Sequence, residues 1–203
     1  MPETSAPHLR SFSMKFIIIS LLLFLALLPS CGLAQGRFMY GFNAGINFWN
    51  LYRHDLTDGS YSSSNRIVYP IGGIEFGYFD WNHFSYSGQI IFDQSSVEIP
   101  LLFNVPITHG EWKVYAFAGP TVSLLTAEYR DLLYDNESNY GICGGIGISH
   151  PLSRTTDLFC QASYAYGLKN VIPQYAFVFP GEHLYKGYTR ILRIYFGILF
   201  GGE

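Results

Sequence analysis

Charge is scarce in this chain. Of its 203 residues, only 13% are Asp, Glu, Lys or Arg, against about 25% in a typical soluble domain. The net charge is −3 and no run of five or six like charges occurs, so the electrostatic signal of a nucleic-acid binder is missing. The composition therefore excludes a nucleic-acid partner and argues against a soluble enzyme. The length leaves room for one domain.

Long hydrophobic runs are also absent, with one exception near the N-terminus. From Met14 the sequence reads M-K-F-I-I-I-S-L-L-L-F-L-A-L-L-P-S-C-G-L-A-Q, the positive, apolar and small-residue order of a secretory signal peptide. We predict that residues 1–34 are a signal peptide with an N-terminal extension and that residues 35–203 form the mature domain. An uncleaved anchor and lipid attachment at Cys31 are the alternatives. Beyond residue 35, no apolar run approaches the ~20 residues of a spanning helix.

What the chain has instead is aromatic residues in alternation, with 16 Tyr and 17 Phe. In residues 38–48, F-M-Y-G-F-N-A-G-I-N-F, the even positions are apolar and the odd ones from Gly41 on are Gly or Asn. A strand with this pattern has one apolar face and one small, polar face. The same split recurs and gives eight candidate strands, at residues 38–48, 73–78, 84–93, 96–107, 113–124, 141–149, 158–168 and 188–200.

Eight strands with an aromatic outer face predict an all-β fold, an eight-stranded antiparallel up-and-down transmembrane β-barrel. A soluble sandwich is the alternative, but its core would be the apolar face, and the glycine-rich polar face suits a barrel interior better. The expected connections at 80–83, 108–111 and 151–157 are short, whereas those at 51–68, 127–139 and 169–187 are long. This asymmetry is typical of barrels in the outer membrane of a Gram-negative bacterium, with outer-membrane lipid as the surrounding partner.

Alternation also predicts which charges lie inside the barrel. They are Glu75, Asp93, Glu98, Lys113 and Arg193. Because an eight-stranded barrel is only wide enough to be filled by side chains, we expect an ion-paired, closed interior in which Arg193 balances some of the acids. A narrow pore for ions or small solutes is the alternative.

The stretch S-V-E-I-P-L-L-F-N-V-P-I, residues 96–107, has a proline where barrels normally exclude it. Every strand of a closed barrel has two neighbours, so Pro100 removes a hydrogen-bond donor from the ladder. With a turn near residues 109 and 110, Pro100 lies within one residue of direct opposition to Pro120. We predict a shared bulge or gap between these two strands.

Cysteine and histidine show no metal-ligand spacing, so no metal or other cofactor is expected. Cys143 and Cys160 fall on opposite faces of their strands, which makes a disulfide unlikely to form. A lipid-active enzyme would need a His and an acid at the extracellular rim, and only His54 with Asp55 and His183 with Glu182 are available there. These residues fit solvated loops better, so we expect no catalytic activity.

The last long connection is rich in aromatic residues, namely Tyr175, Phe177, Phe179 and Tyr185. Exposed aromatic patches often mark partner sites, so this loop is a candidate partner surface. Folding of the loop over the barrel mouth, or extension of the strands beyond the membrane, are equal alternatives.

Several motifs occur in the order seen in one known family. V-E-I-P-L-L-F-N, V-Y-A-F-A-G-P-T-V-S-L-L and the opening G-F-N-A-G-I-N-F resemble the outer-membrane β-barrel domain family that includes PorT-like proteins. The resemblance covers about residues 36 to 200. It implies an outer-membrane barrel, and for one branch of the family a part in protein export by a secretion apparatus. We therefore expect a non-enzymatic barrel that scaffolds or interacts with secretion or envelope proteins through its extracellular loops.

Overall fold

The computed structural model describes residues 36–55, 61–63, 67–80, 83–94, 96–125, 138–169 and 185–201. The predicted signal peptide, the possible lipidation site Cys31, the rim pair Glu182 and His183, and the loop residues Tyr175, Phe177 and Phe179 lie outside the described residues. No helix in the described ranges is long and apolar enough to cross a membrane.

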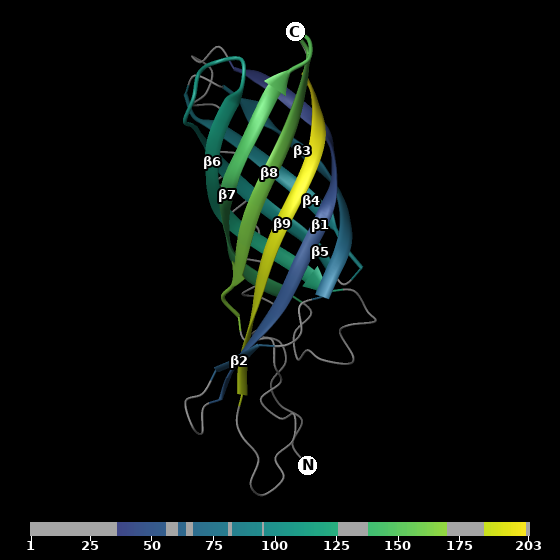
Figure 1. The fold of residues 1–203 in the computed structure, drawn as a ribbon, viewed down its shortest axis with the longest axis vertical. Helices are drawn as coiled ribbons and strands as arrows, with labels where there is room; N and C mark the ends of the chain where they lie inside the picture. The colour runs from purple at the N-terminus through teal and green to yellow at the C-terminus, as the bar shows by residue number, and fades with distance from the viewer. Residues whose placement is uncertain are drawn as a thin grey trace, which may run out of the picture. The chain divides into compact units, whose positions relative to one another are not determined.

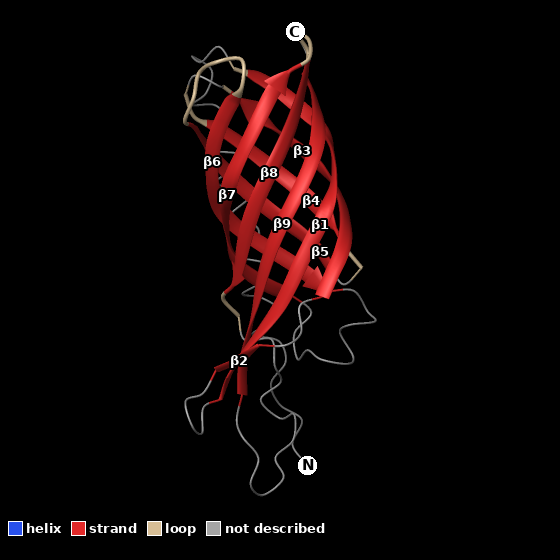
Figure 2. Cartoon of the chain, in the orientation of Figure 1, coloured by secondary structure: helices blue, strands red, loops and turns tan. Residues whose placement is uncertain are grey.

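Eight long antiparallel strands close into a barrel, as predicted (Figures 1 and 2). The ring runs β1-β3-β4-β5-β6-β7-β8-β9, and β9 returns to pair with β1. A short β2 pairs only with the end of β1. The strands are β1 Arg37–Asp55, β2 Tyr61–Ser63, β3 Ile67–Phe79, β4 Ser85–Phe92, β5 Ser96–Pro106, β6 Lys113–Leu125, β7 Ser138–Pro151, β8 Thr156–Gly167 and β9 Tyr185–Gly201.

Several strands are longer than the sequence pattern indicates. β3 begins at Ile67 rather than at residue 73, because Pro70 and two glycines interrupt the alternation without interrupting the pairing with β1. β1 and β9 continue beyond the rest of the wall and pair as far as Asp55 and Tyr185. Tyr185 is therefore the first residue of β9 and not part of a loop, which corrects one of the four residues assigned to the partner loop.

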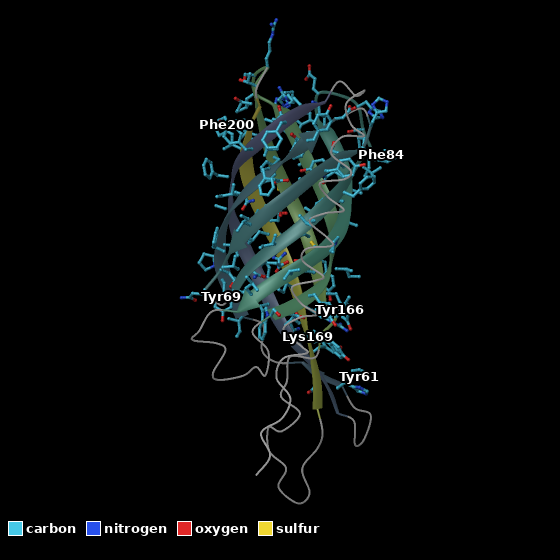
Figure 3. All side chains as sticks on the ribbon, turned by 180° about the vertical axis from the view of Figure 1, so that it is seen from behind. Tyr61, Tyr69, Phe84, Tyr166, Lys169 and Phe200 are labelled. Atoms are coloured by element: carbon cyan, nitrogen blue, oxygen red, sulfur yellow. The ribbon has the colours of Figure 1, made fainter. Side chains whose placement is uncertain are left out.

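Burial follows the predicted alternation on every strand of the ring. Inward positions are buried and often polar, whereas outward positions are apolar and exposed, as in Phe42, Ile146 and Phe196, with 58%, 61% and 62% exposure. The outer face is covered with such side chains (Figure 3). Aromatic rings gather near the ends of the strands, for example Tyr40 with Phe200 and Phe84 with Phe103, whose ring centroids are 6.2 and 5.1 Å apart.

Inward glycines allow the strands to pass close to one another. A Cβ added at Gly41 would overlap the carbonyl of Ile198 on the neighbouring strand, and one at Gly45 would overlap that of Ile194. Glycine kinks of this kind provide the curvature that a small barrel needs to close. The glycine-rich inner face thus reflects the geometry of closure as well as the lack of space inside.

Short turns connect the strands at one end. In the turn after β3, the Asp80 N–H donates to Ser85 Oγ at 2.9 Å, and Ser85 Oγ donates back to the Asp80 carbonyl at 3.0 Å. The turn between β4 and β5 at the other end is also tight, because the Ser96 N–H donates to Asp93 Oδ1 at 2.6 Å. The remaining connections at that second end span 56–66, 126–137 and 168–184, so the asymmetry predicted from connection lengths is present.

Candidate functional site

Among the described residues, the polar side chains that form the most contacts with one another lie inside the barrel. At its centre the Arg193 guanidinium from β9 forms an ion pair with the Glu98 carboxylate from β5, and their side chains are only 1% and 3% exposed. Thr121 Oγ1 from β6 donates to the second Glu98 oxygen at 2.7 Å. β5 and β9 lie four strands apart in either direction around the ring, so this contact joins opposite walls and crosses the lumen.

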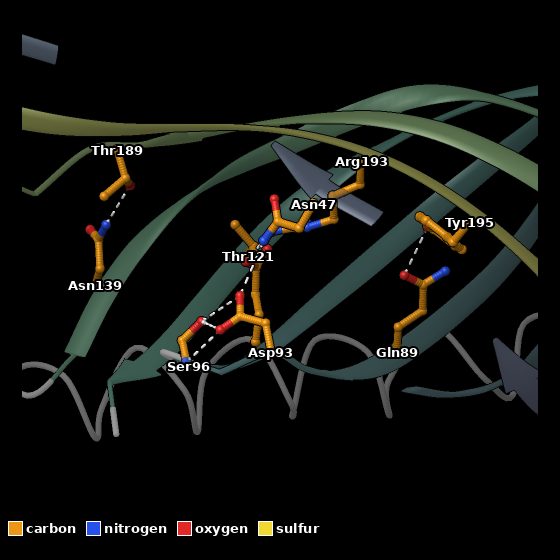
Figure 4. Close-up of polar contacts among 10 residues, drawn as sticks. Asn47, Gln89, Asp93, Ser96, Thr121, Asn139, Thr189, Arg193 and Tyr195 are labelled. Atoms are coloured by element: carbon orange, nitrogen blue, oxygen red, sulfur yellow. Dashed lines mark hydrogen bonds and ion pairs between the residues drawn. The ribbon is translucent and has the colours of Figure 1, made fainter. Parts of the chain in front are cut away.

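A second layer crosses the lumen between β4 and β8, which also lie on opposite walls. Gln89 Nε2 donates to Gln161 Oε1 at 3.1 Å, and Gln161 Nε2 donates to the Tyr115 hydroxyl at 2.8 Å. The Tyr195 hydroxyl donates to Gln89 Oε1 at 3.1 Å and also contacts Gln161 Oε1. Figure 4 shows the contact between Gln89 of β4 and Tyr195 of β9. All four side chains are buried, so the layer is closed by uncharged hydrogen bonds.

A third group of contacts lies nearer the end with the long connections (Figure 4). Asp93, a predicted lumen charge, accepts a hydrogen bond from Asn47 Nδ2 at 3.1 Å and one from Ser96 Oγ, which lies 3.2 Å from both carboxylate oxygens. Asn139 Nδ2 donates to Thr189 Oγ1 at 2.9 Å. These contacts join β1 with the β4–β5 turn and β7 with β9, strands two positions apart in the ring, and do not reach opposite walls.

The end with the short turns has an ion pair that the sequence analysis missed. Arg37 Nη2 lies 2.8 Å from Asp157 Oδ1, and Arg37 also contacts the carbonyl of Arg154. Asp157 is fully buried, whereas Arg37 is 27% exposed. Both residues are at inward positions of their strands, so parity could have identified them, but they lie just outside the predicted strands. Lys113, which was predicted as a lumen charge, lies half-buried at the start of β6 at this same end.

Glu75 occupies the lumen as predicted but takes no part in the central ion pair. Its side chain is fully buried on β3, and Ser87, Gln89 and Gln161 surround its carboxylate. Neither carboxylate oxygen has a hydrogen bond that meets ordinary geometry. Arg193 therefore balances Glu98 and leaves Glu75 as a second, separate acid in the interior.

The two predicted ladder prolines lie on facing strands. Pro100 is opposite Thr121, and the register places Pro120 opposite Leu101. Between β5 and β6 the ladder lacks Leu101 and Leu102, and between β4 and β5 it lacks Ile99 and Pro100. Each interruption is accounted for by one missing proline N–H, because Pro100 would donate toward β4 and Pro120 toward β5. The register is the same on both sides of each gap, so the ladder has two gaps and no bulge.

Of the residues considered for catalysis, only His54 has a side chain that the structure describes. The His54 ring stacks on Tyr61 of β2 with centroids 4.4 Å apart. No group of three His, Cys, Asp or Glu side chains within the described ranges could hold a metal ion. Cys143 is buried inside, Cys160 is on the outer face, and both are free thiols, in agreement with their parity.

Parity also places one cation on the outer face that the sequence analysis did not single out. Arg190 is at an outward position of β9, and its guanidinium carbon lies 3.7 Å from the centre of the Tyr52 ring. The Tyr166 ring centre is 5.6 Å away. The signal in the sequence was the even position of this arginine on a strand whose even positions are apolar.

The outer surface identifies the environment of the barrel. It is apolar around the ring, it ends in aromatic rings, and the closed antiparallel wall leaves no unpaired long edge. A hydrocarbon environment requires closure of this kind, because backbone groups there cannot bond to water. An even number of strands with short turns at one end is the architecture of the bacterial outer membrane. The protein is therefore an outer-membrane β-barrel of a Gram-negative bacterium, surrounded by lipid.

No protein-family model matches the sequence, and no curated protein matches it either. Among solved structures, the chain is similar to outer membrane protein OprG from Pseudomonas aeruginosa, with 13% identity, 83% of this chain and 98% of that chain covered, and a TM-score of 0.46. It is also similar to outer membrane protein AlkL (11% identity, 85% and 92% covered, TM-score 0.49) and to Neisserial surface protein A (12%, 79% and 97%, 0.46). Likenesses this distant assign no function to the chain, and membership of the PorT-like family stays a prediction.

Proposed function

We propose that the protein is a non-enzymatic outer-membrane barrel with a closed interior, which acts as a scaffold or interaction protein through its extracellular side. The observation that carries this proposal is the set of direct contacts between opposite walls, Arg193 with Glu98 and Gln89 with Gln161. A solute that crossed the barrel would have to separate both contacts. Breaking a buried ion pair alone costs about 3–5 kcal/mol.

A pore is the second candidate, and one observation favours it. Several buried polar atoms that line the interior have no hydrogen-bond partner, among them Nε and Nη1 of Arg193 and both amide atoms of Asn43. Buried polar groups of this kind are commonly bridged by water, and a chain of water could carry small ions. The two candidate functions, a closed barrel and a pore, therefore differ in whether ions pass through the interior.

Conductance in planar lipid bilayers separates these two candidates. We expect the wild-type protein to give no stable channels. As a positive control, a variant in which Glu98, Arg193, Gln89 and Gln161 are all replaced by alanine removes both cross-wall contacts and is expected to conduct. Stable, reproducible openings of the wild-type protein would overturn the closed interior.

The absence of catalysis is the second part of the proposal. The observation that supports it is that the His54 ring stacks on the Tyr61 ring, which is a packing contact and not the hydrogen bond that links a general base to its partner. The test is release or transfer of fatty acyl groups from phospholipid and glycolipid vesicles by the purified protein. We expect no turnover above that of the double variant His54→Ala with His183→Ala. Turnover that this variant loses would establish a lipid-active enzyme instead.

The interaction partner is proposed to belong to a secretion apparatus or to the machinery that maintains the envelope. The PorT-like motifs and the aromatic residues Tyr175, Phe177 and Phe179 support this class of partner. Crosslinking in native envelopes, followed by identification of the linked proteins, tests it. We expect recovery of the same envelope proteins in repeated experiments, and their loss when the three aromatic residues are replaced by serine. Recovery that does not depend on these residues would exclude this loop as the contact surface.

A further inference from the structure

Arg190 lies at the edge of the apolar band on the outer face of the barrel. On the outward row of β9, Leu192, Ile194 and Phe196 are exposed apolar side chains, and Arg190 is the next residue in the row. Phe200, at the other end of the row, contacts Tyr40 of the aromatic belt at the short-turn side. The ten residue-to-residue steps from Phe200 to Arg190 advance about 33 Å. A strand tilt of roughly 35–45° leaves about 25 Å along the membrane normal, the height of the apolar band.

Arg190 therefore lies at the extracellular boundary of the membrane, on the lipid side of the wall. Figure 3 shows Tyr166, its direct partner on β8, at the end of the barrel opposite Phe200. At this depth a charged side chain costs only about 0–1 kcal/mol, whereas at the midplane it would cost about 2–4 kcal/mol. The position tolerates a cation and gives it access to the headgroup region.

The neighbours of Arg190 hold its side chain without neutralising it. The guanidinium lies over the Tyr52 ring, with its carbon 3.7 Å from the ring centre, and the Tyr166 ring centre is farther away, at 5.6 Å. Tyr166 itself stacks on Tyr188, with ring centroids 6.2 Å apart and planes at 14°. No carboxylate among the described side chains pairs with Arg190, and its Nε is buried and has no hydrogen-bond acceptor. Aromatic rings bind the flat face of a guanidinium, so the terminal N–H donors in the guanidinium plane stay free for an anion.

A second polar group without a partner lies directly opposite. Asn50 of β1 faces Arg190 in the ladder, at an outward position, and its Oδ1 is buried and has no hydrogen-bond donor. An arginine that served only as part of the aromatic belt would not need an unpaired amide oxygen beside it. Together these groups match three parts of a ligand. The arginine can bind a phosphate, the amide oxygen can accept a hydrogen bond from a hydroxyl, and the three tyrosine rings can pack against a sugar ring.

We infer that Asn50, Tyr52, Tyr166, Tyr188 and Arg190 form a binding site for a phosphorylated glycolipid of the outer leaflet. Arg190 binds the phosphate through its in-plane N–H donors, and the tyrosines contact the sugar. The chemistry favours a phosphorylated sugar over a simple anionic phospholipid, because only the sugar has both hydroxyl donors for the amide and a ring that can lie against the tyrosine rings. The site lies on the outer wall and does not depend on whether the interior is closed.

Native mass spectrometry of the full chain in detergent tests this site. The protein is titrated with bisphosphorylated lipid A, with dephosphorylated lipid A, and with phosphatidylglycerol. We expect the bisphosphorylated lipid to bind most tightly, and Arg190→Gln to lower its affinity about tenfold, because charge-assisted hydrogen bonds are lost. Arg190→Lys is expected to recover only part of the affinity, because lysine cannot donate in the bidentate manner.

Arg154→Gln is the matched control. It removes the same charge from an exposed turn residue at the opposite end of the barrel and is expected to leave lipid affinity unchanged. Heat-dependent gel mobility verifies that each variant is folded. Equal affinity of the wild-type protein for lipid A and phosphatidylglycerol, or unchanged lipid A affinity in folded Arg190→Gln, would overturn the proposal and leave Arg190 as an ordinary member of the aromatic belt.

Discussion

The ion pair between Arg193 and Glu98 allows a quantitative test of how the interior is held together. Both side chains are almost completely buried, and they come from opposite walls of the barrel. Arg193→Met removes the cation but keeps much of its volume, and leaves the Glu98 carboxylate with only the Thr121 hydroxyl. Removal of one partner from a buried pair costs about 3–5 kcal/mol, because the other charge stays buried and unpaired. Glu98→Gln is expected to cost a similar amount, because it leaves the guanidinium unpaired.

The double variant distinguishes pairing from simple loss of packing. With Glu98→Gln and Arg193→Met together, neither position leaves a partner as an unpaired buried charge, and replacement of a buried pair by uncharged groups is often neutral or stabilising by about 1–4 kcal/mol. We therefore expect the double variant to be as stable as the wild-type protein within about 1 kcal/mol. The coupling free energy between the two substitutions is then at least as large as the unfolding free energy that one single variant loses.

Equilibrium unfolding in urea, with the barrel in lipid vesicles, measures these free energies. The fluorescence of the three tryptophans reports unfolding, and gel mobility of unheated samples provides an independent probe. Arg154→Gln is again a control, because surface substitutions usually change stability by less than about 0.5 kcal/mol. A double variant as unstable as the single variants, or single variants that lose less than 1 kcal/mol, would refute the reasoning.

Three further predictions concern the wall and the second layer. Pro120→Val restores an N–H opposite the Leu101 carbonyl, so we expect the amide of residue 120 to be protected from hydrogen exchange, with a gain of up to about 1 kcal/mol in unfolding free energy; rapid exchange at this amide would disprove the account of the gap. Gly41→Val would place a Cβ on the Ile198 carbonyl and is expected to prevent barrel formation, whereas Gly72→Ala, whose nearest neighbour atom is 3.9 Å away, is expected to fold, as gel mobility will show. Gln161→Leu leaves the Tyr115 hydroxyl and the Gln89 amide without their partner, so we expect a loss of about 1–3 kcal/mol in urea unfolding; an unchanged midpoint would mean that these hydrogen bonds do not stabilise the layer.

The sequence was sufficient to predict which residues face the interior, but not which of them meet. Side-chain alternation is local and has a period of two, so Glu75, Glu98 and Arg193 could be assigned to the lumen from their own strands. Contact between Arg193 and Glu98 depends on the stagger of strands around the barrel, which links shear to strand tilt. These residues are 95 positions apart in the chain. No local pattern distinguishes Glu98 from Glu75 as the partner of Arg193.

Strand ends were harder to predict than strand centres, for a physical reason. The pattern of apolar and polar faces arises from lipid on one side and the lumen on the other, and it fades where strands extend into water. β1 continues to Asp55 and β9 begins at Tyr185, although their outer parts contain polar residues on both faces. Arg37, Asp157 and Arg190 all lie near such boundaries.

The wall of the barrel is paired unevenly, and this has consequences for its assembly. The ladder between β1 and β9 runs without interruption from Met39 and Gly201 to Asp55 and Tyr185, whereas β5 has a gap on each side. The β1–β9 seam joins the segments that are furthest apart in the sequence, and pairings of that kind form late because loop closure must precede them. Until β9 arrives, β1 is an open edge that can pair with other chains. The last step of insertion is thus also the one that seals the barrel. Because the β4–β5 and β5–β6 ladders each lack two pairs, we expect the wall to open beside β5 before it opens between β1 and β9 when it is stressed in the membrane.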